Sequence, residues 1–116
     1  MAAGTYNLTI EQGATFRLLV EWLDGSNPVD LTDFSARMQI RPYAASDEVF
    51  ITLDTGSNGG ITIESDWVIL IEIPAEDTAL LDEYCGVYDL ELESLTGVVT
   101  RLLQGSVTIS PEVTRS

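Results

Sequence analysis

Hydrophobic residues recur at every second position along most of the chain, which is the period of a β-strand with one buried face. Ala36, Met38 and Ile40, for example, alternate with polar neighbours that would face solvent. A helix would instead repeat every three or four residues, and that period is rare in this chain. The strands predicted by the alternation are residues 6–11, 15–22, 35–41, 49–53, 61–63, 67–73, 86–93 and 98–110.

Turn-forming residues separate most of these strands. Residues 24–28 (Asp-Gly-Ser-Asn-Pro) and 56–60 (Gly-Ser-Asn-Gly-Gly) are dense turn signals. Residues 74–81 begin with proline and two acids, an order that favours one or two helical turns. Gly105 interrupts the last strand, where we expect a bend or β-bulge. Short strands divided by turns predict an all-β sandwich of about seven to eight antiparallel strands with one short helix.

Length and composition place this fold in one domain. The 116 residues are 45% hydrophobic and 21% charged, enough apolar material for a single core. We therefore predict one domain over residues 1–116, with residues 111–116 as a flexible tail. No apolar run approaches the roughly 20 residues of a membrane span, and no signal peptide is visible at the N-terminus.

The charge balance limits the partners that this chain can bind. The chain has nineteen acidic and five basic residues, which gives a net charge of −14, and all five basic residues are arginines. Nucleic acids and anionic membranes need a basic footprint, so neither is expected as a partner. The absence of histidine and lysine excludes histidine-based triads, histidine-bound zinc and Walker-type phosphate loops. We expect no small-molecule substrate, cofactor or metal, and a binding or structural role rather than an enzyme.

One motif suggests an alternative. Asp54 opens an Asp-Thr-Gly sequence after an apolar strand, which resembles the active-site signature of dimeric aspartic proteases, where two aspartates share a proton. The segment that should cross behind such a loop is missing, because residues 97–99 read Gly-Val-Val, the reverse of the required order. The residues after Asp54 are also typical of a hairpin loop, and this structural interpretation is preferred.

A second alternative is a calcium site in residues 24–30. Asp24, Ser26, Asn27 and Asp30 supply the oxygen ligands that hard cations prefer, as in a calcium-dependent carbohydrate-binding module. Their spacing does not match an EF-hand loop. An Asx-type turn that caps local backbone groups explains the same residues, and it is the preferred interpretation.

Residues that could contact a partner lie on polar strand faces. Arg37 and Arg41 should point outward from one strand and pair with the acids of a neighbour, and Arg101 should pair across strands with Asp89 or Glu91. The first strand, with Tyr6, Leu8 and Ile10, is a possible exposed edge. These six residues are the candidate partner contacts.

Three further side chains have structural interpretations. Trp22 is in phase with the core face of its strand, whereas the position of Trp67 is open. Cys85 cannot form an intrachain disulfide and has no histidine to activate it. An inert, partly buried thiol is therefore expected.

Strand and turn sequences across nearly the whole chain carry a family resemblance. Residues 7–16, 29–41, 88–93 and 99–115 resemble small structural proteins of tailed bacteriophages and prophages, and above all the N-terminal Ig-like domain of phage upper-baseplate proteins. In that domain an Asp-Leu-Thr-Gly-Tyr sequence precedes a strand, and residues 30–34 here read Asp-Leu-Thr-Asp-Phe. The resemblance implies an Ig-like sandwich and a virion component without an enzymatic site.

The resemblance also implies a place of action. It indicates an oligomeric or ring-bound adaptor in the tail, baseplate or head–tail region, located in the virion and assembled in the bacterial cytoplasm. Its partners would be other virion proteins. The 116 residues contain no receptor-binding extension of the kind that follows the domain in the baseplate proteins. A capsid decoration protein of the same fold is therefore the main alternative.

Overall fold

The computed structural model describes residues 3–65, 67–82 and 85–114. Alternating residues form strands throughout, and a single helical turn follows Pro74. The elements are β1 (Gly4–Thr5), β2 (Leu8–Glu11), β3 (Phe16–Glu21), β4 (Leu23–Asp24), β5 (Asn27–Pro28), β6 (Ser35–Arg41), β7 (Ile51–Asp54), β8 (Ile61–Ser65), β9 (Val68–Ile73), α1 (Ala75–Thr78), β10 (Cys85–Glu93) and β11 (Val99–Ser110).

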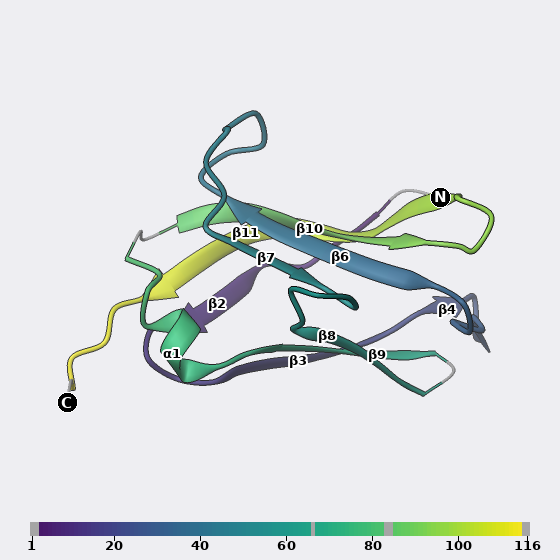
Figure 1. Cartoon of the computed structure of the whole chain (residues 1–116), viewed down its shortest axis with the longest axis horizontal. Helices are drawn as coiled ribbons and strands as arrows, with labels where there is room; N and C mark the ends of the chain where they lie inside the picture. Colours follow the sequence, from purple (N-terminus) through teal and green to yellow (C-terminus); the bar gives the residue numbers. More distant parts are fainter. Residues whose placement is uncertain (1–2, 66, 83–84, 115–116) are drawn as a thin grey trace.

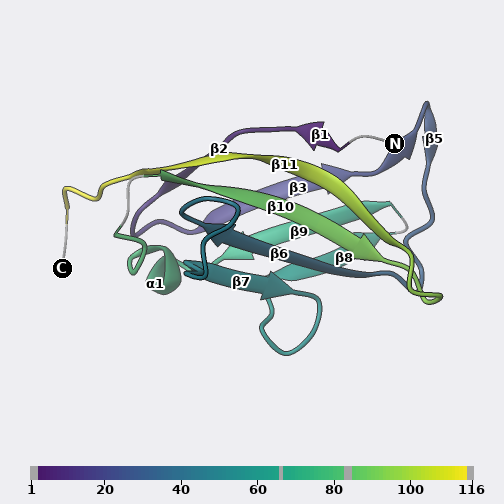
Figure 2. The same cartoon turned by 90° about the horizontal axis from the view of Figure 1, so that it is seen from above.

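The strands form two facing layers (Figure 1). Sheet A has the order β1-β11-β10-β6-β7, and β2 also pairs with β11 beyond the end of β1. Sheet B has the order β3-β9-β8, and β4 and β5 form a separate hairpin. Figure 2 shows sheet A from above, with β1 and β2 along one side and β7 along the other. The predicted all-β sandwich with one short helix is confirmed.

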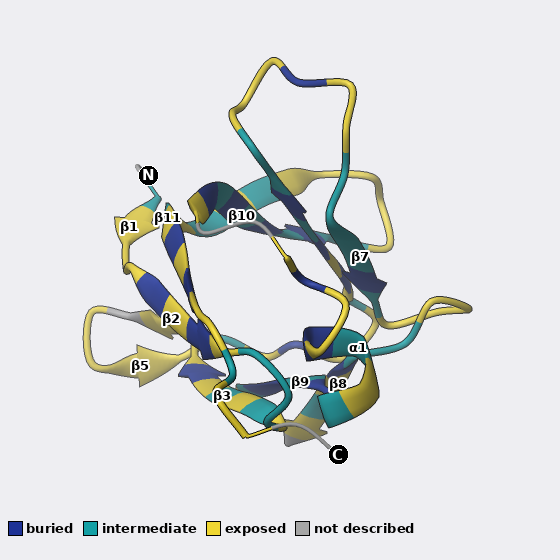
Figure 3. Ribbon diagram, turned by 90° about the vertical axis from the view of Figure 1, so that its left-hand side faces the viewer, coloured by how far each residue is buried: buried dark blue, intermediate teal, exposed yellow. Residues whose placement is uncertain are grey.

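The core lies between the two sheets, as the alternation predicts. Successive residues of β6 and β10 are buried and more exposed in turn (Figure 3). The buried hydrophobic residues of both strands belong to one core cluster, which also contains residues of β9 in the other sheet. Trp22 is buried as predicted, with its ring edge-to-face on Phe34 at a centroid distance of 5.7 Å. The fully buried large side chains are Ile10, Leu31, Met38, Ile40, Ile69, Ile71, Ile73, Leu90, Leu92 and Val107.

The N-terminal strands depart from the predicted antiparallel arrangement. β1 and β2 both pair with β11 in the parallel sense, with Gly4 opposite Leu103 and Leu8 opposite Val107. Between them, the Tyr6 N–H donates to the Gln104 carbonyl at 2.9 Å. Alternation fixes which side chains point inward, but it carries no information on strand direction. The alternation of hydrophobic residues therefore could not predict the parallel pairing.

The bulge predicted at Gly105 lies elsewhere. Leu90 is opposite Leu103 and Glu91 is opposite Arg101, so Leu102 is the extra residue on β11. Gly105 instead allows a close backbone approach, because a Cβ atom there would lie 2.3 Å from the Tyr6 carbonyl oxygen. The glycine is thus explained by the N-terminal segment that passes beside it.

Candidate interaction surface

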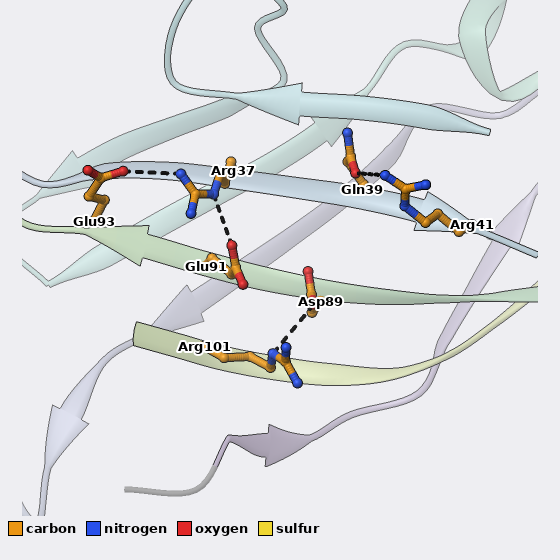
Figure 4. Close-up of polar contacts among 7 residues, drawn as sticks. All are labelled: Arg37, Gln39, Arg41, Asp89, Glu91, Glu93 and Arg101. Carbon is orange, nitrogen blue, oxygen red and sulfur yellow. Dashed lines mark hydrogen bonds and ion pairs between the residues drawn. The ribbon is translucent and has the colours of Figure 1, made fainter. Parts of the chain in front are cut away.

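The outward side chains of sheet A form a surface that we call the polar face. It comprises the outward residues of β6, β10 and β11, and it carries all three arginines predicted to contact a partner (Figure 4). The strand register brings them together: Arg37 is opposite Glu91 on β10, and Glu91 is opposite Arg101 on β11. Arginines from two strands therefore flank a row of acids on the strand between them.

Arg37 pairs with acids of the neighbouring strand, as predicted. Its Nε donates to Glu91 Oε1 at 2.9 Å, and its Nη1 donates to Glu93 Oε1 at 3.1 Å. The hydrogen bond to Glu91 is the main reason why the pKa of the Arg37 guanidinium is raised. The arginine side chain is half exposed, so each pair contributes at most about 1 kcal/mol to stability.

Arg101 pairs with Asp89, also as predicted. The distance from Arg101 Nε to Asp89 Oδ2 is 3.4 Å, and Arg101 Nη1 donates to Gln104 Oε1 at 3.2 Å. Burial raises the pKa of the Asp89 carboxyl, and the nearby charge of Glu91 adds to this effect. Arg101, Arg37 and Arg41 act in the opposite direction without overcoming it.

Arg41 does not form the predicted pair with an acid. Its Nη2 donates to Gln39 Oε1 at 2.7 Å, and its Nη1 donates to the carbonyl oxygen of Ser46. Ser46 is buried in the loop between β6 and β7, only five residues from Arg41. The cause of the difference is therefore local: the loop that follows β6 supplies a carbonyl oxygen to the guanidinium.

A depression of about 580 Å³, open to solvent, lies beside these side chains. It is lined by polar and charged groups such as Gln39, Arg41, Asp89 and Gln104, with Val87 and Ala44 as apolar lining. Cationic, anionic and neutral polar side chains are therefore all present in its lining. Such a surface suits a protein partner with complementary polar groups.

The side chains of the first strand are divided between surface and core. Tyr6 is half exposed, and its backbone carbonyl accepts a hydrogen bond from the Tyr88 hydroxyl at 2.6 Å. Leu8 and Ile10 are buried in the core, so their side chains do not reach a partner. The strand does lie at an edge of sheet A, and its backbone, the half-exposed Tyr6 and the outward Thr9 and Glu11 can take part in contacts there.

Asp54 stabilises the loop that follows it. Its Oδ1 accepts from the backbone N–H groups of Gly56 at 2.9 Å and Asn58 at 3.1 Å, and its Oδ2 accepts from Asn58 Nδ2 at 2.8 Å. The side-chain bond from Asn58 is the largest cause of the lowered pKa of Asp54. These bonds explain the Asp-Thr-Gly sequence as the start of a loop. The loop is not the predicted hairpin, because it carries the chain from β7 in sheet A to β8 in sheet B, and these two strands do not pair.

The other candidate groups also have local roles. Asp30 Oδ1 accepts from the Thr32 N–H at 2.9 Å and the Thr32 hydroxyl at 2.6 Å, which is the predicted Asx-type turn. Within residues 3–65, 67–82 and 85–114, no group of three or more acids or cysteines is placed to hold a metal ion. Cys85 is exposed rather than partly buried, because it begins β10 on the outer side.

Two polar side chains of the face were missed by the sequence reasoning. Gln39 bonds both Arg41 and Thr52 Oγ1, and Gln104 bonds Arg101. Gln39 lies in phase with Arg37 and Arg41, and this phase is the signal that could have included it. Gln104 is three residues from Arg101 and shares its face only because of the bulge at Leu102, so the phase of the strand could not reveal it. Arg115, the remaining arginine, lies outside the described residues.

Comparisons with known proteins identify the fold and no family. No family model matches the chain, and no curated protein sequence matches it. One similar solved chain belongs to a study of parallel homodimers of the extracellular domains of the voltage-gated sodium channel β4 subunit and their role in cell–cell adhesion. It is 8% identical over 97% of both chains, with a TM-score of 0.48.

A second similar chain comes from a study of T cell specificity and activation by the bacterial superantigen toxic shock syndrome toxin-1. It is 12% identical, covers 89% of this chain and 92% of that chain, and has a TM-score of 0.51. At this identity the likeness concerns the fold alone. Among the described residues, no helix is long and apolar enough to cross a membrane. The comparisons therefore agree with a β-sandwich and leave the activity to be argued from the surface.

Proposed function

We propose that this chain is a non-enzymatic structural module that docks onto a larger protein assembly through the polar face. The observation that carries the proposal is the gathering of Arg37, Arg41 and Arg101 on one sheet face of a molecule with a net charge of −14. Elsewhere on the described surface, Arg17 is the only other arginine. The polar face is thus where an acidic or mixed-charge partner meets the least repulsion.

The bonding within the face supports recognition rather than chemistry. Arg37 and Arg101 are held by acids, and Arg41 is held by Gln39 and the loop carbonyl of Ser46. Fixed side chains lose little conformational entropy when a partner binds. The face therefore presents a preorganised pattern of charges.

We further propose that the assembly is a tailed-bacteriophage particle. The resemblance of the strand sequences to upper-baseplate proteins supports an adaptor in the tail, baseplate or head–tail region, located in the virion. A capsid decoration protein is the second candidate. Both roles need the same docking chemistry, and they differ in the number of copies per particle.

Quantitative mass spectrometry of particles from the source phage or induced prophage tests this assignment. The measured quantity is the number of copies of this chain relative to the major capsid protein. A small number that corresponds to one ring supports the adaptor, and a ratio near one supports decoration. Absence of the chain from purified particles would contradict both the adaptor and the decoration role.

The docking face has its own test. Arg101→Ala should weaken binding to the particle or to the isolated ring protein, because it removes a cation and frees Asp89. Thr62→Asp changes the net charge by the same amount on the outer side of sheet B and should leave binding unchanged. Equal losses from both variants would show that only overall charge matters and would contradict the assignment of the face.

A further inference from the structure

Strand β3 is an unprotected edge of sheet B. It pairs with β9 on one side only, and Figure 3 shows it at the border of the layer that also contains β9 and β8. The six residues of β3 pair with β9 without a register shift, and they contain neither proline nor lysine. Natural edge strands are commonly blunted by bulges, prolines or charged side chains. β3 carries the charges of Arg17 and Glu21 but has neither a bulge nor a proline, so its regular backbone can pair with another strand.

The backbone groups that face this open edge can be identified. The Trp22 N–H donates to the Trp67 carbonyl at 3.1 Å on the β9 side, and the Glu72 N–H donates to the Gly60 carbonyl at 2.8 Å on the β8 side. Because backbone groups alternate along a strand, both bonds place the even-numbered residues of β3 toward β9. The N–H and C=O groups of Arg17, Leu19 and Glu21 are therefore directed toward the open edge.

The side chains of the same three residues lie on the outer side of sheet B. Leu19 is 64% exposed, so it presents apolar surface beside the open edge. Arg17 pairs with Glu72 at 3.0 Å, yet its side chain remains largely exposed. Glu21 is exposed, and no ion pair to it is present among the described residues. The edge thus carries a cation, an apolar side chain and an anion at regular spacing.

We propose that a second copy of this chain binds at this edge, with the two β3 strands antiparallel about a two-fold axis at Leu19. In this register Leu19 faces Leu19 of the second copy, and Arg17 faces Glu21 of the second copy on both sides of the axis. Opposite charges and apolar side chains directly across a strand pair are favourable. The joint sheet has the order β8-β9-β3-β3-β9-β8, an isologous interface.

The alternation of backbone groups restricts the register. Only odd-numbered residues present hydrogen-bonding groups at the edge, so the two strands can shift only in steps that keep odd residues opposite one another. A shift by one such step in either direction places Leu19 opposite Arg17 or Glu21. The register centred on Leu19 is the one that pairs every outward side chain with a complementary partner, which is why a second copy fits this edge.

A charge-exchange experiment tests the register. Arg17→Glu and Glu21→Arg should each lose the dimer, because each homodimer places like charges opposite one another twice. An equimolar mixture of the two variants should recover it, because the mixed dimer has opposite charges at both positions. Native mass spectrometry or sedimentation measures the species, and circular dichroism checks that each variant is folded.

Three outcomes would overturn the proposal. In the first, the wild-type chain stays monomeric at concentrations up to about 1 mM, the limit of weak association. Alternatively, the dimer persists in both single variants, which shows that it uses another surface. Finally, the mixture dimerises no more than its components do.

Disulfide trapping gives an independent test. Directly paired residues of a hydrogen-bonded antiparallel pair have Cα atoms about 5.5 Å apart, within the range that a disulfide spans. Leu19→Cys in a Cys85→Ser background should therefore form a covalent dimer rapidly on mild oxidation. Leu80→Cys in the same background is the control, since Leu80 is 77% exposed and is not part of β3. Equal trapping at both positions would contradict the proposed contact.

Discussion

Tyr88 connects the centre of sheet A to the N-terminal segment. Its ring is buried, and its hydroxyl donates to the Tyr6 carbonyl at 2.6 Å. Burial raises the pKa of Tyr88 from 10.0 to about 12, with a smaller contribution from the charge of Tyr6. A folded pKa above the unfolded value means that the neutral form is favoured in the fold. This contribution to stability is complete below pH 10 and is lost as the pH rises toward 12.

Tyr88→Phe should lower the free energy of unfolding at pH 7 by about 1 kcal/mol, because the Tyr6 carbonyl loses its hydroxyl partner. The variant should also lose less stability than the wild type between pH 10 and pH 12. Urea unfolding at several pH values measures both effects. Tyr43→Phe is the control: Tyr43 is 62% exposed, and its replacement should change neither quantity. A variant as alkali-sensitive as the wild type would assign the sensitivity to another group.

Asp89 and Asp54 should respond to pH with opposite signs. The pKa of Asp89 is raised, mainly by burial, so its stabilising effect belongs to the protonated form and is lost as the pH rises through the folded pKa. The pKa of Asp54 is lowered, mainly by Asn58, so its contribution is present above pH 3.8 and is lost as the pH falls through the folded pKa.

Asp89→Asn should therefore be neutral or stabilising at pH 7 in spite of the lost pair with Arg101, whereas Asp54→Asn should be destabilising there. Both differences from the wild type should shrink below the folded pKa of each carboxyl. Thermal unfolding at a series of pH values from 7 downward measures them, with each variant serving as the control for the other. Loss of stability in Asp89→Asn at pH 7 would show that the ion pair outweighs burial.

At the scale of elements, the junction of β1, β2 and β11 depends on Gly105. A Cβ atom at this position would lie 2.3 Å from the Tyr6 carbonyl oxygen and 2.9 Å from Asn7 Oδ1. Gly105→Ala should therefore displace the Tyr6 segment and lower the free energy of unfolding by about 1–3 kcal/mol. Hydrogen exchange of the Tyr6 N–H should accelerate.

Gly56→Ala is the matched control for Gly105→Ala. Its φ is not in the left-handed region, and a Cβ atom there would meet Asp54 Oδ1 at an ordinary 3.5 Å. It should leave both stability and exchange at Tyr6 close to those of the wild type. Similar losses in the two variants would contradict the close approach as the cause, since the lower flexibility of alanine in the unfolded chain would by itself raise stability.

The strands and their contacts show which features the hydrophobic alternation predicts and which it does not. The strand predicted over residues 35–41 coincides with β6, and the ion pairs of Arg37 and Arg101 follow from the same phase carried across neighbouring strands. The parallel pairing of β1 and β2 with β11 joins segments far apart in the sequence, which a local pattern does not contain. The bulge at Leu102 and the contact of Arg41 with the Ser46 carbonyl depend on backbone geometry, which the alternation of side chains does not specify.

For the molecule as a whole, the net charge of −14 opposes compaction. The charges repel one another over distances of about 8–10 Å at moderate ionic strength, and added salt screens this repulsion. The melting temperature of the dilute monomer should therefore rise when NaCl is increased from about 0.01 M to 0.5 M. The exposed ion pairs weaken under the same conditions, but each contributes little. A falling melting temperature would show that the ion pairs dominate.

The parallel pairing of the first strands with β11 also restricts the order in which the chain folds. Leu8 is opposite Val107, so the edge of sheet A joins residues that are almost the whole chain apart. During synthesis, Leu8 and Ile10 reach their places in the core only after β11 has left the ribosome. Until then their apolar side chains are available to chaperones. Closing so long a loop slows folding, which for β-sandwiches occurs in milliseconds to seconds. Completion of this fold therefore waits for the synthesis of β11.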